Sequence, residues 1–161
     1  MKKLLILGMG NKLFGDDGVG IVVAERLREI YNNYENIDIE ETSWGGFRII
    51  DLLDGYNTAI VIDALQTKRK HLGFVHKLDY QDLIHSVRMV SFHDINFATA
   101  IEFAKIMDIT MPEKIMVFGI EVDETDHFSE EISPIIKRSV ESCINMVVEE
   151  IESLQVEEVE N

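Results

Sequence analysis

Cysteine, which can cross-link a chain, and proline, which interrupts helices and strands, are both scarce in this sequence, and each shortage excludes a class of protein. The 161 residues include one cysteine, so an internal disulfide and a zinc cluster of several thiolates are both excluded. Two prolines in a chain that is 46% hydrophobic argue against a disordered or collagen-like protein. No apolar run reaches the roughly 18 residues of a membrane span, and Gly8–Lys12 interrupts the first one too early for a signal peptide. We therefore expect a cytoplasmic protein that does not enter a membrane.

Positive charge is also scarce. Fifteen basic residues accompany 30 acidic ones, and the formal net charge of −15 argues against nucleic acid as a partner. No basic residue follows Arg138, whereas seven acids lie between Ser139 and Asn161. The length fits one domain. We predict a single domain over residues 1–152 and an acidic C-terminal tail over residues 153–161.

Apolar runs alternate along the chain with segments of helical periodicity. The predicted strands are Lys3–Met9, Asn36–Thr42, Thr58–Ile62, Gly73–Leu78 and Lys114–Ile120. The predicted helices are Gly18–Asn33, Arg48–Asp54, Ile95–Met107 and Ile132–Leu154. This alternation predicts an α/β fold, a three-layer α/β/α sandwich around a mostly parallel, twisted sheet of about five strands. Gly73–Leu78 follows the preceding strand too closely for a helical crossover, so we expect it to pair antiparallel with that strand.

Polar residues at the strand-to-helix junctions are the first candidates for chemistry, because ligands of such folds bind beyond the C-terminal ends of the strands. Asp17 lies in the glycine-rich turn Gly8–Gly20 after the first strand, Asp63 ends the third strand, and His93 precedes the third helix. Each has a structural interpretation when taken alone. Asp16 or Asp17 can cap the next helix, Asp63 can be a surface acid, and a lone histidine is more often structural.

Taken together, Asp17, Asp63 and His93 have the chemistry of a metal site. Two carboxylates and one imidazole suit a divalent ion such as nickel or zinc, with coordination positions left open. Magnesium would not explain the histidine. No serine or cysteine lies in a nucleophile elbow, and we expect Cys143, inside the last predicted helix, to serve packing.

The glycine-rich turn also allows a nucleotide-binding α/β module. Two features argue against this alternative. Leu13 stands where the dinucleotide fingerprint requires its third glycine, and Asp16 and Asp17 would repel a diphosphate at the start of the helix.

Four segments resemble, in the same order, the motifs of the endopeptidases that mature [NiFe] hydrogenases. They are Gly8–Gly20, Tyr56–Ala64, Ser91–Asp94 and Val117–Glu121. The resemblance extends over roughly residues 1–152. The segment Trp44–Phe47 departs from the Gly-Thr pair that relatives often have before the second helix.

The resemblance implies an endopeptidase that removes a C-terminal extension from the hydrogenase large-subunit precursor after nickel insertion. It implies that the nickel belongs to the substrate, that no cofactor is tightly bound, and that Asp17, Asp63 and His93 contact the metal and carry the catalysis. Which of the three acts as the general base stays open. A non-catalytic, metal-sensing chaperone of the same precursor is a further alternative.

Overall fold

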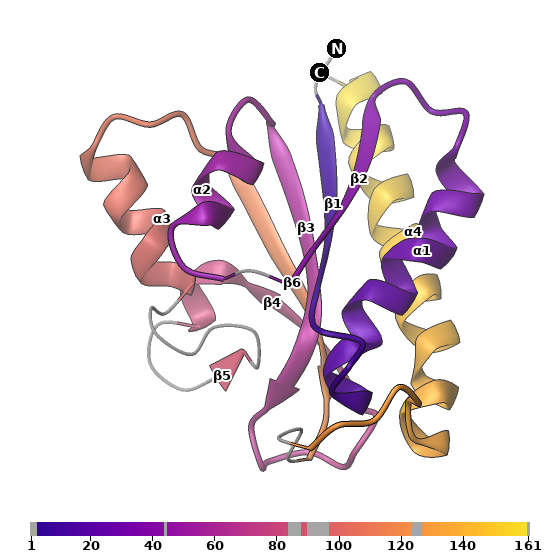
Figure 1. Ribbon diagram of the computed structural model, residues 1–161. Helices are drawn as coiled ribbons and strands as arrows, with labels where there is room; N and C mark the ends of the chain where they lie inside the picture. The colour runs from indigo at the N-terminus through magenta and orange to yellow at the C-terminus, as the bar shows by residue number, and fades with distance from the viewer. Residues whose placement is uncertain (1–2, 44, 84–87, 90–96, 124–126, 161) are drawn as a thin grey trace.

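The protein has three layers, with a central sheet and helices on both faces (Figure 1). The computed structural model describes residues 3–43, 45–83, 88–89, 97–123 and 127–160. The strands are β1 (Leu4–Met9), β2 (Ile37–Thr42), β3 (Thr58–Gln66), β4 (Val75–Asp79), β5 (Arg88–Met89) and β6 (Lys114–Glu121). The helices are α1 (Val19–Tyr31), α2 (Arg48–Leu53), α3 (Phe97–Ile106) and α4 (Pro134–Glu160), with the short 3-10 helices η1 (Gly15–Gly18) and η2 (Tyr80–Leu83).

The main sheet has the strand order β2-β1-β3-β6-β4. The first four strands are parallel, β4 is antiparallel to β6, and the two-residue β5 pairs antiparallel with the end of β3. The predicted α/β fold with a mostly parallel sheet and one antiparallel strand is confirmed. The predicted neighbour of the antiparallel strand is wrong, because β4 pairs with β6 and not with β3. The almost completely buried β6 suits the inner position, whereas the half-exposed β4 suits an edge.

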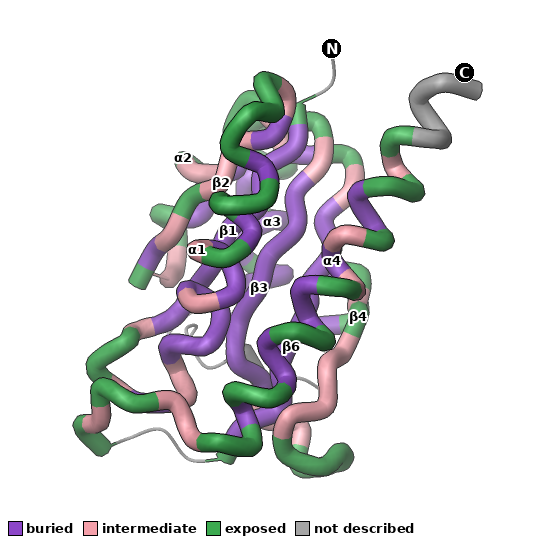
Figure 2. Tube along the Cα trace, turned by 90° about the vertical axis from the view of Figure 1, so that its right-hand side faces the viewer, coloured by how far each residue is buried: buried purple, intermediate pink, exposed green. Residues whose placement is uncertain are grey.

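Alternate residues of the central strands β1, β3 and β6 enter two separate hydrophobic cores. One face of the sheet packs against α1 and α4, through residues such as Ile6, Ile62 and Phe118. The other face packs against α2 and α3, through residues such as Leu7, Val61 and Val117. Figure 2 shows the sheet buried between exposed outer surfaces of the helices. Burial on both faces explains why the central strands appear in the sequence as continuous apolar runs.

Helix α4 is longer than predicted and continues to Glu160, through the segment that we predicted as an acidic tail. Cys143 is fully buried on this helix, and burial raises the pKa of its thiol to about 12, so the predicted packing role is confirmed. In the described part of the chain, no helix combines the length and the apolar character needed to cross a membrane.

Glu150 on α4 is an acid inside the structure rather than on its outer face. It is 7% exposed and forms ion pairs with Lys77 of β4 and, at 3.2 Å, with Lys114 of β6. Burial raises the pKa of the Glu150 carboxyl, but the hydrogen bonds and charges of the two lysines outweigh this effect, so the pKa lies below its usual value. The carboxylate therefore joins α4 to two strands of the sheet.

We predict that Glu150→Gln lowers the free energy of unfolding at pH 7 by about 1–2 kcal/mol, because two half-exposed lysines lose their partner. Because the pKa of Glu150 is lower in the folded state, its ionised carboxylate stabilises the fold at pH values above the pKa that the carboxyl has in the unfolded chain. That contribution is lost as the pH falls through the folded pKa. Urea denaturation at pH 7 and at a series of lower pH values measures this. The difference in the free energy of unfolding between the original protein and Glu150→Gln should become smaller as the pH falls. The control is Glu149→Gln at the exposed neighbouring position, and a pH-independent difference would contradict the prediction.

Candidate active site

The chain reverses its direction across the sheet between β1 and β3. From β1 it passes through α1 to β2, and from β2 it passes through α2, on the opposite face, to β3 on the other side of β1. The connection after β1 therefore leads toward β2 on one side of the sheet, and the connection after β3 leads toward β4 on the other side, so the two directions separate between β1 and β3. Such a switch point is the usual ligand site of open α/β sheets. The segment after β1 contains Asp17, and the C-terminal half of β3 contains Asp63.

Asp17 belongs to η1, which is part of a compact turn after β1. The turn begins with an Asx motif, in which the side chain of Asn11 accepts a hydrogen bond from the amide of Leu13 at 3.0 Å. Asp17 is half-buried, and its Oδ1 atom lies inside the protein. The expectation that one of the two aspartates caps the next helix is wrong. No side-chain cap is formed at Phe14 before η1 or at Gly18 before α1.

Two glycines bring this turn against the sheet. A Cβ atom at Gly20 would overlap the carbonyl oxygens of both Met9 in β1 and Ile62 in β3. A Cβ atom at Gly10, whose φ is +147°, would overlap the carbonyl oxygen of Asp17. The missing side chains thus allow the first turn of α1 to pack directly on the two strands. The contact at Gly20 lies three residues after Asp17, and its partner Ile62 directly precedes Asp63 in β3.

Asp63 lies within β3 and not at its end as predicted, because the strand continues to Gln66. Ala64 and Leu65 are also fully buried, and β3 stays paired with β6 up to Leu65 opposite Glu121. The Asp63 side chain is 0% exposed, and its Oδ1 accepts a hydrogen bond from the amide of Ala64 at 2.8 Å. It alternates with Val61 and Leu65, so it faces the side of the sheet that α2 and α3 cover.

His93 lies outside the described residues, as does the neighbouring Asp94. On either side of this segment, Met89 pairs with Leu65, two residues beyond Asp63, and α3 begins at Phe97, whose side chain is buried. Among the residues that the structure describes, no three His, Cys, Asp or Glu side chains come together as a metal site.

Glu121, the last residue of the motif Val117–Glu121, is a second buried acid at this end of the sheet. Glu121, 1% exposed at the end of β6, accepts hydrogen bonds from the amide and the hydroxyl of Thr67, the latter at 2.6 Å. Its Oε2 lies 3.4 Å from Nε2 of His76. Burial raises the pKa of the Glu121 carboxyl, but the hydrogen bonds from Thr67 and the contact with His76 outweigh it, and the pKa is lowered. The sequence signal that could have indicated these contacts is an acid, Glu121, at the end of a continuously apolar strand.

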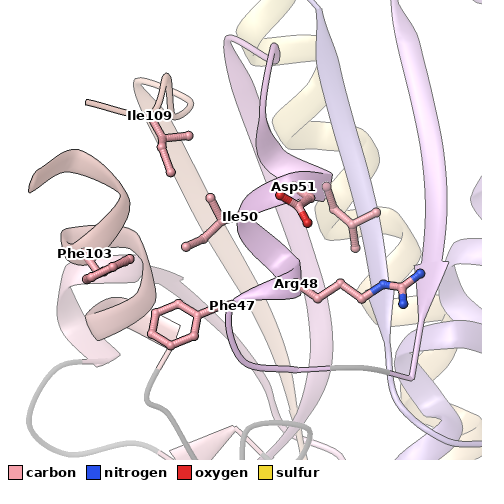
Figure 3. A pocket seen from close by; sticks show the side chains of 7 residues that line it. Phe47, Arg48, Ile50, Asp51, Phe103 and Ile109 are labelled. Carbon is pink, nitrogen blue, oxygen red and sulfur yellow. The ribbon is translucent and has the colours of Figure 1, made fainter. Parts of the chain in front are cut away.

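A pocket of about 680 Å³ lies between α2 and α3 (Figure 3). The rings of Phe47 and Phe103 pack against each other in its lining, with centroids 5.0 Å apart and a tilt of 56°, and Ile50 and Ile109 extend the apolar wall. Arg48 and Asp51 are the charged residues of its lining. A pocket of this composition can accept apolar side chains.

Solved structures of hydrogenase maturation endopeptidases have the same fold. The endopeptidase HybD from Escherichia coli matches over 94% of this chain and 93% of its own, with a TM-score of 0.77 and 18% identity. The [NiFe] hydrogenase maturation protease HybD from Thermococcus kodakarensis matches over 91% of this chain and 97% of its own, with a TM-score of 0.68 and 23% identity. The predicted three-layer architecture is therefore that of a known class of peptidases.

The family model described as "Hydrogenase maturation protease" matches residues 21–150, and the chain belongs to this family. It is therefore a hydrolase, a hydrogenase maturation endopeptidase, as the resemblance implied. The hydrogenase 2 maturation protease of Escherichia coli is 20% identical over 96% of this chain and 94% of its own length. The hydrogenase expression/formation protein HupD of Thiocapsa roseopersicina is 22% identical over 91% of this chain, which spans 66% of that relative.

We predict that Gly20→Ala impairs both stability and activity. The added methyl group must push α1 away from Met9 and Ile62, which should cost about 1–3 kcal/mol of the free energy of unfolding. The same shift moves Asp17 relative to Asp63, so peptide-bond cleavage should fall by more than the loss of folded protein explains. Thermal unfolding and cleavage of a precursor, measured on the same samples, test this.

Gly55→Ala is the matched control for Gly20→Ala. Gly55 has a φ of +84° and open space where a Cβ atom would lie, in the turn between α2 and β3 at the opposite edge of the sheet. The substitution should cost about 1 kcal/mol through backbone strain alone and leave cleavage unchanged. Equal losses of cleavage in the two variants would show that the contact at Gly20 has no special effect on the site.

Proposed function

We propose that this protein removes the C-terminal extension of a [NiFe] hydrogenase large-subunit precursor, in the cytoplasm, and does so only after nickel has been inserted. Asp17, Asp63 and His93 are proposed to contact the nickel that the precursor carries. The observation that supports this most is the location of Asp17 and Asp63, one on each side of the switch point between β1 and β3.

The burial of the two carboxylates favours a cation at this edge. The Asp63 side chain is fully shielded from water, and one oxygen of Asp17 lies inside the protein. Charges interact more strongly where protein replaces water, because the effective dielectric constant is lower. A divalent ion brought by the substrate would therefore interact with both acids over a short range.

The donor set explains why the metal should arrive with the substrate. Two carboxylate oxygens and one imidazole nitrogen hold nickel less firmly than a site that includes thiolates, and the only cysteine of the chain is buried on α4. Nickel already held by the precursor can instead accept these three groups at its open positions. Recognition of the metal then places the peptide bond of the extension beside the same three side chains.

Cleavage requires a water molecule and a base. The water oxygen forms a bond to the carbonyl carbon of the peptide, the carbon–nitrogen bond breaks, and the proton taken from the water reaches the leaving amine. The carboxylates of Asp17 and Asp63 and the imidazole of His93 are groups that can accept and return this proton. Nickel polarises the carbonyl when it is bound there.

We predict that the protein cleaves nickel-loaded precursor and leaves nickel-free precursor intact. Purified protein is mixed with each form under the same conditions, and intact-mass spectrometry detects the loss of the extension. The physical reason is that the extension is positioned only when the metal joins the two proteins.

Equal cleavage of both forms would contradict the role of nickel while leaving the protease activity in place. Binding of nickel-loaded precursor with no change in its mass would instead support the alternative of a metal-sensing chaperone. A catalytic control with a precursor that lacks the extension should show no mass change at all.

We predict that Asp17→Asn, Asp63→Asn and His93→Gln each reduce cleavage of nickel-loaded precursor at least about 100-fold, because amides neither take up the proton nor bind a metal as carboxylates and imidazole do. Thermal unfolding should show that the variants stay folded. Full activity in any variant would remove that residue from the site.

Glu113→Gln is a matched control for these variants. Glu113 is exposed and directly precedes β6, so it lies at the opposite edge of the sheet. It carries the same charge change without touching the candidate site. A loss of activity in this control would indicate that net charge, and not a specific contact, governs cleavage.

A further inference from the structure

Asp16, the neighbour of Asp17, is bound to a distant part of the chain. Its Oδ1 accepts a hydrogen bond from the amide of Ser133 at 2.7 Å, and its Oδ2 accepts one from the Ser133 hydroxyl at 2.8 Å. Both oxygens of one carboxylate are thus engaged by one residue, 117 positions away. Such a two-point contact fixes the direction of the side chain as well as its position.

Ser133 is a rigid anchor, because it is the cap residue of α4. Its carbonyl oxygen accepts a hydrogen bond from the amide of Lys137 at 2.9 Å, and Pro134 occupies the first position of the helix. The following turns of α4 bury Ile136 and Val140 against the sheet. The hydroxyl of Ser133 is turned toward Asp16, so the aspartate connects the turn after β1 to the longest helix of the protein.

The segment 127–133, which we call the strap, adds further contacts to the same turn. The amide of Gly15 donates to the carbonyl of Ser129 at 2.6 Å, and the amide of Ser129 donates to the carbonyl of Leu13 at 2.9 Å. The rings of Phe14 and Phe128 pack with centroids 5.0 Å apart. The strap therefore holds the residues directly before Asp16 on one side of the turn.

Gly10 holds the turn from the other side. It lies so close to Asp17 that a Cβ atom on it would overlap the Asp17 carbonyl oxygen, and its own amide donates to Thr42 at the end of β2. The backbone of Asp17 is thus enclosed between the end of β1 and the turn that the strap and Asp16 secure. A shift of about 1 Å in a reacting group can cost 100-fold in rate.

We propose that Asp16 is a positioning residue: its contact with Ser133 orients the turn that holds Asp17 beside the switch point between β1 and β3. This rests on the proposed function, in which Asp17 touches the substrate. Asp16 acts through its hydrogen-bond geometry and not through its charge, which distinguishes it from Asp17. The first acid of the Asp16-Asp17 pair is structural support, and the second meets the metal.

The test compares substitutions that remove the hydrogen bonds with ones that keep them. Asp16→Ala removes both, whereas Asp16→Asn can still accept from the Ser133 amide and donate to a rotated Ser133 hydroxyl. We expect the kcat for nickel-loaded precursor to fall at least about 10-fold in Asp16→Ala and to stay within about threefold of the original in Asp16→Asn. Ser133→Ala should give an intermediate loss, and Ser133→Thr, which keeps the hydroxyl, should restore activity.

The outcomes separate this proposal from the proposed function. If the unaltered protein cleaves the precursor and Asp17→Asn does not, full activity of Asp16→Ala overturns the positioning role. Inactivity of Asp16→Asn equal to that of Asp17→Asn also overturns it, because the charge of Asp16 would then be required. If Asp17→Asn is fully active, the proposed site itself is wrong.

A second readout does not depend on catalysis. In two-dimensional amide NMR spectra, Asp16→Ala should shift the resonances of Gly10 and Asp17 more than those of Gly55, which lies at the opposite edge of the sheet. Asp16→Asn should leave Gly10 and Asp17 close to their original positions. Unchanged Gly10 and Asp17 resonances in a folded Asp16→Ala protein would show that the contact with Ser133 does not set the turn.

Discussion

The close packing of α1 against the ends of β1 and β3 is the contact on which the candidate site depends. Gly20 has no side chain where the helix meets the carbonyl groups of Met9 and Ile62, so the helix begins directly on the two strands. Since Asp17 precedes this contact by three residues and Asp63 follows Ile62, the contact holds the segment of Asp17 against the part of β3 that contains Asp63. A larger residue at this position would separate what the sheet topology brings together.

The acidic residues of the protein fall into groups with different physical roles. Most are exposed and contribute to the net charge of −15. Glu150 is buried and joins α4 to β4 and β6 through lysines, and Glu121 is buried against Thr67 and His76. Asp16 is engaged with Ser133, which leaves Asp17 and Asp63 as the described acids proposed to meet a metal. The number of acids alone could not distinguish these roles, because each depends on what surrounds the carboxylate.

The elements themselves could be predicted from local patterns, and their ends agree with the structure to within a few residues except at two places. β3 was predicted to end at Asp63 because an acid usually ends an apolar run, but its pairing with β6 continues beyond this residue and the strand extends to Gln66. α4 was predicted to end earlier than Glu160, because the apolar pattern fades in its last turns. In both places the element is continued by backbone hydrogen bonds, those of the β3–β6 pairing and those of the last turns of α4, and the pattern of apolar residues does not predict them.

The order of the strands could not be read from the chain in the same way. The short connection after β3 correctly indicated an antiparallel strand, yet β6 lies between β3 and β4. An inner strand must be buried on both faces, so the choice depends on how apolar all the strands are. The continuously apolar β6 takes the inner position, and the half-polar β4 lies at the edge.

By itself, the sequence determined the α/β class and the family, and it indicated Asp17 and Asp63 as candidates, because periodicity and short motifs are local properties. Only the tertiary structure decided that Asp16 binds Ser133, that His76 meets Glu121, and that Glu150 is buried between two lysines. These partners are distant along the chain, and no local pattern encodes which of many polar residues will meet when α4 and the sheet pack together.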